Sequence, residues 1–91
     1  MASFTVQLDA LVEVRAILAE LTERTREEAG CLDYGYYQSL ADPLHFFSFE
    51  VWQTAEAESE HWQTQHLQNA LERVGPLLKE APVITRSTRI T

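Results

Sequence analysis

Residues 3–8 alternate polar and apolar side chains, which is the spacing of a strand with one buried face. The apolar positions are Phe4, Val6 and Leu8. Asp9 is a candidate N-cap for a following helix, because its side chain can accept a hydrogen bond from a free backbone N–H group. Apolar residues then recur at helical spacing, at Leu11, Val14, Leu18 and Leu21. We expect this helix to end at Gly30, since glycine readily adopts the left-handed conformation.

Two β-rich segments follow, at residues 31–39 and 44–52. The first contains Tyr34, Tyr36 and Tyr37, and aromatic residues favour strands. An Ala-Asp-Pro sequence at residues 41–43 is typical of a turn. The pattern therefore predicts a β-hairpin.

The second strand of this hairpin has two different faces, because successive side chains point to opposite sides of a sheet. We expect the more uniformly apolar face to pack under the helices. It carries His45, Phe47, Phe49 and Val51. The other face carries Leu44, Phe46, Ser48, Glu50 and Trp52. This mixture fits neither a plain core nor a solvated surface, and it predicts a cavity or an interface.

The remainder of the chain predicts more helix and a last strand. Thr54 is a candidate N-cap for a short helix that runs to about Trp62. A second apolar stripe at helical spacing, disturbed at Gly75-Pro76, consists of Leu67, Leu71, Val74 and Leu78. Residues 83–91 are rich in β-branched side chains and predict a strand.

The predicted order is β-α-β-β-α-β, the split arrangement of an α+β ferredoxin-like fold with its helices on one face of the sheet. A chain of 91 residues is too short for two cores, so residues 1–91 are expected to form a single domain. The other face of the sheet would be bare. Because we expect it to carry Phe46 and Trp52, it is too apolar to remain in water, and pairing with a second copy would cover it.

Composition narrows the range of functions. Seven basic and 14 acidic side chains give a net charge of −7, which repels nucleic-acid phosphates and anionic lipid surfaces. No apolar run approaches the ~20 residues of a membrane span, and no signal-peptide pattern is visible. The single cysteine, Cys31, excludes a disulfide within one chain and suits a reducing compartment. We therefore expect a cytoplasmic protein that binds neither nucleic acid nor membrane.

Several short motifs occur in a fixed order along the chain. They are residues 25–34 (Thr-Arg-Glu-Glu-Ala-Gly-Cys-Leu-Asp-Tyr), Asp42-Pro43, residues 49–52 (Phe-Glu-Val-Trp), His61 and His66. Together they resemble the antibiotic-biosynthesis-monooxygenase family, whose usual Glu-Pro-Gly is Glu-Ala-Gly here. The resemblance covers nearly the whole chain and implies a homodimeric α/β barrel with a pocket between the sheet and the helices of each subunit. Some members oxidise quinols or aromatic polyketides with molecular oxygen, using neither metal nor flavin, whereas others have no established activity.

The resemblance also singles out candidate site residues. Trp52 matches a tryptophan near the pocket of polyketide-oxidising members, where it could stack on an aromatic substrate and donate its indole N–H, or simply pack. Glu50 and His61 are the two candidate bases, and each has a structural role as its alternative. We expect no cofactor and no metal site, because His61 and His66 have no cysteine or His-x-x-His partner nearby.

Four further residues complete the expected substrate-binding set. Ser48 stands where the polyketide-oxidising relatives have asparagine and could bind a substrate hydroxyl, whereas Glu58 stands where they have a tyrosine. Phe46 lies on the same strand face as Ser48. Tyr34 and Tyr36 share one face of their strand, but the sequence does not fix the hairpin register that decides which face lines the pocket.

Three functions compete for this set of residues. The first is a cofactor-independent monooxygenase acting on a small aromatic quinol or phenol and molecular oxygen. His61 or Glu50 would remove a proton, the phenolate would pass an electron to oxygen, and an apolar pocket would shield the radical pair from water. The second is a ligand-binding or sensing protein without catalysis. The third, heme degradation, is not expected, because the heme-ligating histidine of related folds corresponds to Leu71.

Overall fold

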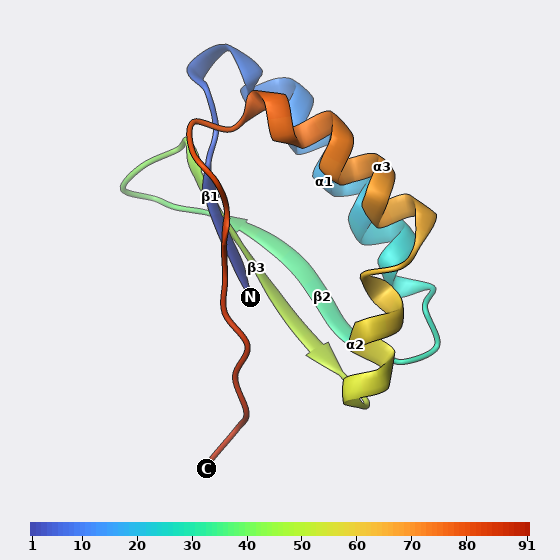
Figure 1. The fold of residues 1–91 in the computed structure, drawn as a ribbon. Coiled ribbons are helices and arrows are strands. Elements are labelled where there is room, and N and C mark those ends of the chain that lie inside the picture. The colour runs from blue at the N-terminus through green and yellow to red at the C-terminus, as the bar shows by residue number, and fades with distance from the viewer.

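A four-stranded antiparallel sheet is covered on one face by helices (Figure 1). The computed structural model describes residues 1–91. The strands are β1 (Ala2–Thr5), β2 (Cys31–Gln38), β3 (His45–Trp52) and β4 (Val83–Ile84), in the spatial order β2-β3-β1-β4. The helices are α1 (Leu11–Arg26), α2 (Ala55–His61) and α3 (Gln65–Val74), with 3₁₀ turns η1 (Leu8–Ala10) and η2 (Gly75–Leu77). The predicted α+β ferredoxin-like fold is confirmed.

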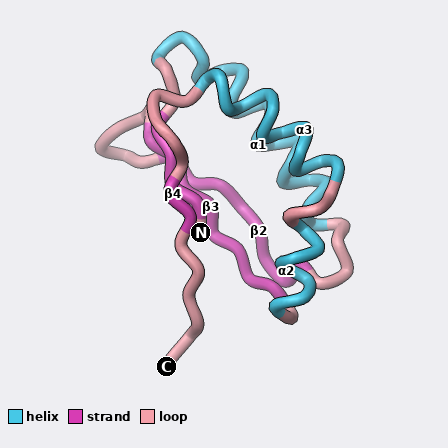
Figure 2. Tube along the Cα trace, viewed as in Figure 1, coloured by secondary structure: helices cyan, strands magenta, loops and turns pink.

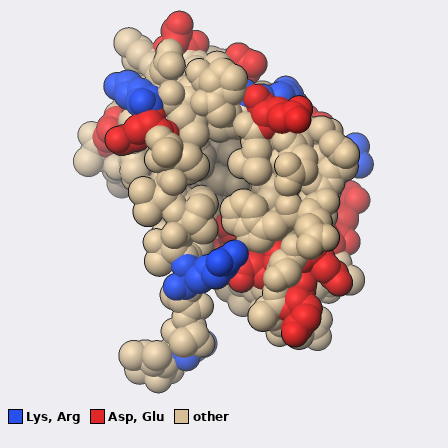
Figure 3. All heavy atoms as spheres, in the orientation of Figure 1, with Lys and Arg blue, Asp and Glu red and all other residues tan.

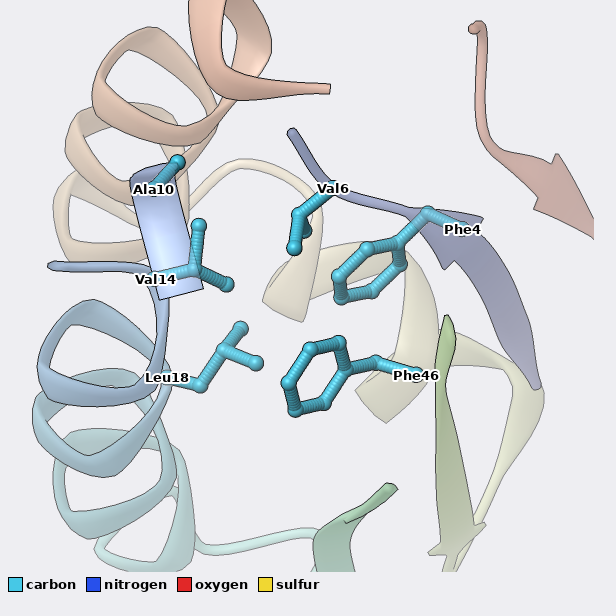
Figure 4. Close-up of a cluster of buried hydrophobic side chains, with 6 residues drawn as sticks. All are labelled: Phe4, Val6, Ala10, Val14, Leu18 and Phe46. Atoms are coloured by element: carbon cyan, nitrogen blue, oxygen red, sulfur yellow. The ribbon is translucent and has the colours of Figure 1, made fainter. Parts of the chain in front are cut away.

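Two hydrophobic clusters join the helices to the sheet. The first contains Phe4, Val6, Ala10, Val14, Leu18 and Phe46. Figure 4 shows the side chains from α1 directed towards the two phenylalanine rings, which stack with their centroids 5.9 Å apart. The second cluster contains Ile17, Leu21, Tyr34, Leu67, Ala70 and Val74. The apolar stripe expected on the first helix is therefore buried at Val14, Leu18 and Leu21.

The hairpin register is now fixed. Tyr34 lies opposite Glu50 and Tyr36 lies opposite Ser48 in the antiparallel pairing of β2 with β3. Directly opposed side chains lie on the same face of a sheet. Because Tyr34 and Ser48 are buried beneath the helices, the two tyrosines and Glu50 share the helix-covered face.

The two faces of β3 are the reverse of those expected. Phe46 and Ser48 are buried beneath the helices, whereas half of Phe49 is exposed on the opposite face. The prediction failed because both faces carry large apolar side chains, so hydrophobicity alone does not choose between them. The polar members of the covered face are tolerated there because they form hydrogen bonds with one another. Phe46 and Trp52 consequently do not form the bare face.

The strand ends also differ from expectation. β1 ends at Thr5, and Leu8 lies in η1 with 77% of its surface exposed, because the chain turns there towards α1. The last strand is only Val83–Ile84 instead of residues 83–91. Its partner β1 offers just two pairing positions, so the following residues have no neighbouring strand within the chain and extend away from the body (Figure 2).

Helix ends confirm one predicted cap and correct another. The side chain of Thr54 accepts a hydrogen bond from the backbone N–H of Ala57, so it is the N-cap of α2. Asp9 makes no capping bond, because it lies inside η1 and Ala10 occupies the N-cap position of α1. None of the helices has the length and apolarity needed to span a bilayer. The cytoplasmic location stays a prediction.

Gly30 has a different role from the one expected. The helix α1 ends earlier, at Arg26, and no glycine has a positive φ. A Cβ atom placed on Gly30 would lie 2.2 Å from Cβ of Ala57 in α2. Glycine is therefore required here because α2 approaches the backbone too closely for any side chain.

Candidate functional site

A cavity lies between the helix-covered face of the sheet and the helices. Fourteen of the 18 residues that line it are hydrophobic, and the lining includes residues of all four strands and all three helices. The space-filling view shows a hollow in the middle of one face, bordered by uncharged atoms, with acidic side chains gathered nearer the edges (Figure 3). Such a cavity suits a small, largely apolar ligand.

Few ionisable side chains line the cavity wall. They are the phenols Tyr34 and Tyr36, the carboxylates Glu50 and Glu58, and His61. Four of the predicted site residues therefore share one cavity: His61, Glu50, Tyr34 and Tyr36. The other three, Trp52, Ser48 and Phe46, lie on the same face of β3 without lining this cavity.

Glu50 is held by its neighbours on β3. The hydroxyl of Ser48 donates to Oε2 of Glu50 over 2.8 Å, and the indole N–H of Trp52 donates to Oε1 over 3.2 Å. Ser48 Oγ in turn accepts the backbone N–H of Ala2 over 2.8 Å. These residues alternate along the strand, so their side chains lie side by side on one face. The donors of Ser48 and Trp52 are consequently already used within the protein.

The two tyrosines form a neutral pair. Their hydroxyl oxygens lie 2.9 Å apart. Burial raises the pKa of Tyr34 far above its ordinary value, and the neighbouring Tyr36 adds to this effect. Burial also raises the pKa of Tyr36 to about 12, with a further contribution from the charge of Glu50. Both phenols therefore stay protonated at physiological pH. Because one hydroxyl donates to the other, one O–H of the pair is left to donate to a ligand oxygen.

His61 is almost completely enclosed, with 2% of its surface exposed. It is the last residue of α2, and its ring packs against Trp52 and Tyr34 with centroid distances of 4.8 and 5.4 Å. Its Nδ1 atom lies 2.7 Å from Oε2 of Glu28. Nε2 makes no hydrogen bond within the chain and is the nitrogen left available on the cavity wall.

Glu28 connects His61 to a second histidine. Nε2 of His66, in the first turn of α3, lies 2.7 Å from the same Oε2 atom. The ligand atoms of Glu28, His61 and His66 all lie within 4.8 Å of one another, and these residue types can hold a divalent metal. One oxygen at 2.7 Å from both ring nitrogens has the spacing of two charge-assisted N–H···O hydrogen bonds.

The sequence did not point to Glu28 as a partner of His61. The two residues are 33 positions apart, on different elements, so no local spacing relates them. The one available signal was that Glu28 belongs to the same ordered set of motifs as His61 and His66.

Comparisons of the sequence agree with one another. The family model described as antibiotic biosynthesis monooxygenase matches residues 1–73. The chain is 34% identical over 84 residues to "Putative monooxygenase Rv0793" of Mycobacterium tuberculosis, covering 92% of this chain and 82% of that protein. It is also 32% identical over 73 residues to the uncharacterized protein sll1783 of Synechocystis, covering 80% of this chain. The chain spans 50% of the length of that second relative.

Solved structures share the fold over nearly the whole chain. The structure of Rv0793 superposes with a TM-score of 0.92 at 30% identity, covering 99% of this chain and 90% of the other. PA3566 of Pseudomonas aeruginosa gives a TM-score of 0.90 at 27% identity, with the same two coverages of 99% and 90%. A crystal structure of an antibiotic biosynthesis monooxygenase gives 0.94 at 24% identity, covering 99% and 95%, which supports the fold alone.

Proposed function

The chain belongs to the antibiotic biosynthesis monooxygenase family, and on that premise we propose that it oxidises a small aromatic quinol or phenol with molecular oxygen and without a cofactor. The observation that carries the proposal is the free Nε2 of buried His61 on the wall of a largely apolar cavity. A base beside an apolar space can create a phenolate where water does not surround it.

The cavity supplies the binding contacts. Its hydrophobic lining suits an aromatic ring, and the neutral hydroxyl of Tyr36 can donate to a ligand oxygen. Glu50 lies on the same wall and carries a hydrogen bond on each of its oxygens. Its role is to anchor Ser48 and Trp52 and to favour ligands that present a donor. We therefore assign proton removal to His61 and not to Glu50.

The proposed chemistry needs no external reductant. His61 Nε2 takes the proton of a ring hydroxyl, and the phenolate passes one electron to O₂, which gives a substrate radical and superoxide. Their combination forms a C–O bond. The C–H bond at that carbon and the O–O bond then break, and the second oxygen leaves as water with the proton from the ring carbon and the proton returned by His61. A quinol plus O₂ becomes a hydroxyquinone plus water, and a phenol plus O₂ becomes a quinone plus water. The substrate supplies all the electrons.

We also propose that the protein is a homodimer that pairs through the bare face of the sheet. Phe47, Phe49 and Val51 of β3 lie on this face, and Tyr37 of β2 stacks on Phe47 with ring centroids 5.6 Å apart. About half of Tyr37 and half of Phe49 is exposed in the single chain, at 53% and 50%. A contiguous apolar surface of this kind favours association, and a second copy offers a matching surface.

One observation favours ligand binding without catalysis as the second candidate. Ser48 and Trp52 were expected to contact a substrate, but their side-chain donors form hydrogen bonds to Glu50. Fewer polar groups are then left to orient a reacting ligand.

Oxygen uptake by the purified protein separates these functions. We expect consumption of O₂ with at least one member of a panel of quinols and phenols, under conditions free of added metal and flavin. Calorimetry with the same panel reports binding independently. Binding without oxygen uptake beyond the uncatalysed rate for every member would overturn the monooxygenase proposal and support the binding function.

A further inference from the structure

We propose that Glu28 is the positioning residue of this site, which holds His61 in the tautomer with a proton on Nδ1 and a lone pair on Nε2. The inference rests on the proposed function, because it concerns the nitrogen that would act as the base. Glu28 itself does not line the cavity.

The tautomer follows from what each group can do. A neutral imidazole has one N–H donor and one acceptor nitrogen, and an ionised carboxylate only accepts. Oε2 of Glu28 lies 2.7 Å from Nδ1 of His61, so a hydrogen bond at this distance requires the proton on Nδ1. The lone pair is then on Nε2, the nitrogen without a partner in the chain. A carboxylate beside a catalytic imidazole has this orienting role in hydrolase triads.

The fold holds Glu28 firmly enough for this role. Its backbone N–H donates to the carbonyl of Thr25 and its carbonyl accepts from Cys31, so the turn after α1 is closed on both sides. Gly30 allows α2 to approach this turn closely, which brings His61 within reach. Only 16% of the Glu28 side chain is exposed, which limits competition from water.

His66 fixes the carboxylate from a third element. Its Nε2 lies 2.7 Å from the same oxygen of Glu28, and 26% of its side chain is exposed. A carboxylate oxygen held by donors from α2 and α3 has little freedom to rotate away from His61. The cluster could alternatively serve only to clamp these elements together, and the two roles predict different results.

Substitution Glu28→Gln separates them, because glutamine keeps the shape but presents a donor as well as an acceptor. Its amide can turn the NH₂ group towards His61, which would then accept at Nδ1 and carry its proton on Nε2. We expect loss or mixing of the tautomer, with kcat on a quinol lower by ~10²–10⁴-fold and ligand Kd changed less than about threefold. Glu28→Asp, which keeps the charge, is expected to recover part of the turnover.

The test combines ¹⁵N NMR of the histidine rings with turnover and binding. Spectra of the unmodified protein should show the neutral form of the His61 ring protonated on Nδ1. Glu20→Gln is the control, because Glu20 pairs with Arg73 on the exposed side of the helices; it should change neither the spectrum nor kcat. A proton on Nε2 in the unmodified protein would overturn the inference. So would a Glu28→Gln variant that keeps the proton on Nδ1 and keeps its turnover per folded molecule. The NMR result needs no substrate, so absence of turnover in the unmodified protein would count against the proposed function alone.

Discussion

The imidazole ring of His61 lies against the indole ring of Trp52, with centroids 4.8 Å apart and planes inclined by 36°. Trp52 also donates its indole N–H to Glu50. A single side chain therefore contacts both candidate bases of the cavity wall, Glu50 and His61. The indole therefore packs against His61 from the sheet side, while Glu28 contacts its Nδ1 atom.

Trp52→Phe should retain part of the ring contact and lose the hydrogen bond to Glu50. Because bonds to charged groups contribute ~1.5–3 kcal/mol when well buried, we expect a loss near the lower end of that range for this half-buried pair. Trp52→Ala removes the ring contact as well and should destabilise the protein further. Chemical denaturation of both variants measures their free energies of unfolding and so gives the order of their stabilities. Equal stability of Trp52→Phe and the unmodified protein would show that the indole N–H contributes nothing.

The two faces of β3 are tested by a matched pair of phenylalanines. Phe46→Ala should lower the free energy of unfolding by ~3–5 kcal/mol, because the ring is buried in the first cluster. Phe49→Ala should instead weaken the proposed dimer, since half of this ring is exposed on the bare face. Denaturation at several protein concentrations, together with sedimentation analysis, distinguishes these effects. A monomeric unmodified protein at micromolar concentration would contradict the dimer.

Gly30→Ala should force α2 away from the turn after α1. The new Cβ would lie 2.2 Å from Cβ of Ala57, and overpacking of this kind costs ~1–3 kcal/mol. Adding Ala57→Gly should restore much of the loss, which a double-mutant cycle measures. Gly75→Ala is the control, because nothing lies within 4 Å of the added atom. Equal effects of the two glycine substitutions would mean that the close approach is not what requires Gly30.

Stability should fall in alkaline solution as the buried tyrosines are forced to ionise. Folding raises the pKa of Tyr34 and Tyr36 above the value of about 10 for an unfolded chain. The unfolded state therefore loses these protons first, so the stabilising effect is complete below pH ~10 and declines as pH rises towards about 12. Urea titrations at pH ~9 and pH ~11 should show the decline, and replacing both residues by phenylalanine should reduce it. A decline of the same size in the double variant would assign it to other groups.

The helices and the hairpin could be predicted because the hydrophobic periodicity of each element depends only on residues close together in the sequence. The stripe containing Val14, Leu18 and Leu21 is an example. Non-local relationships were not accessible in the same way. Phe46 and Phe47 occupy opposite faces of β3 with similar hydrophobicity, so the buried face had to be decided by the tertiary fold.

The candidate site shows the same contrast between local patterns and non-local relationships. His61 and Glu50 were recognised from their motifs, and the register that places Tyr34 and Tyr36 on the cavity wall became clear only with the paired strands. Glu28 and His61 are 33 positions apart in the sequence, so no spacing rule predicts their contact.

The most direct test of the account is oxygen-isotope labelling during turnover of a quinol under ¹⁸O₂, with the unmodified protein and with His61→Gln. We predict one ¹⁸O atom in each hydroxyquinone formed and the other in water, a turnover lower by ~10²–10⁴-fold in the variant, and similar ligand binding in both. Equal labelled product from the two proteins per folded molecule would contradict the assignment of His61 as the base.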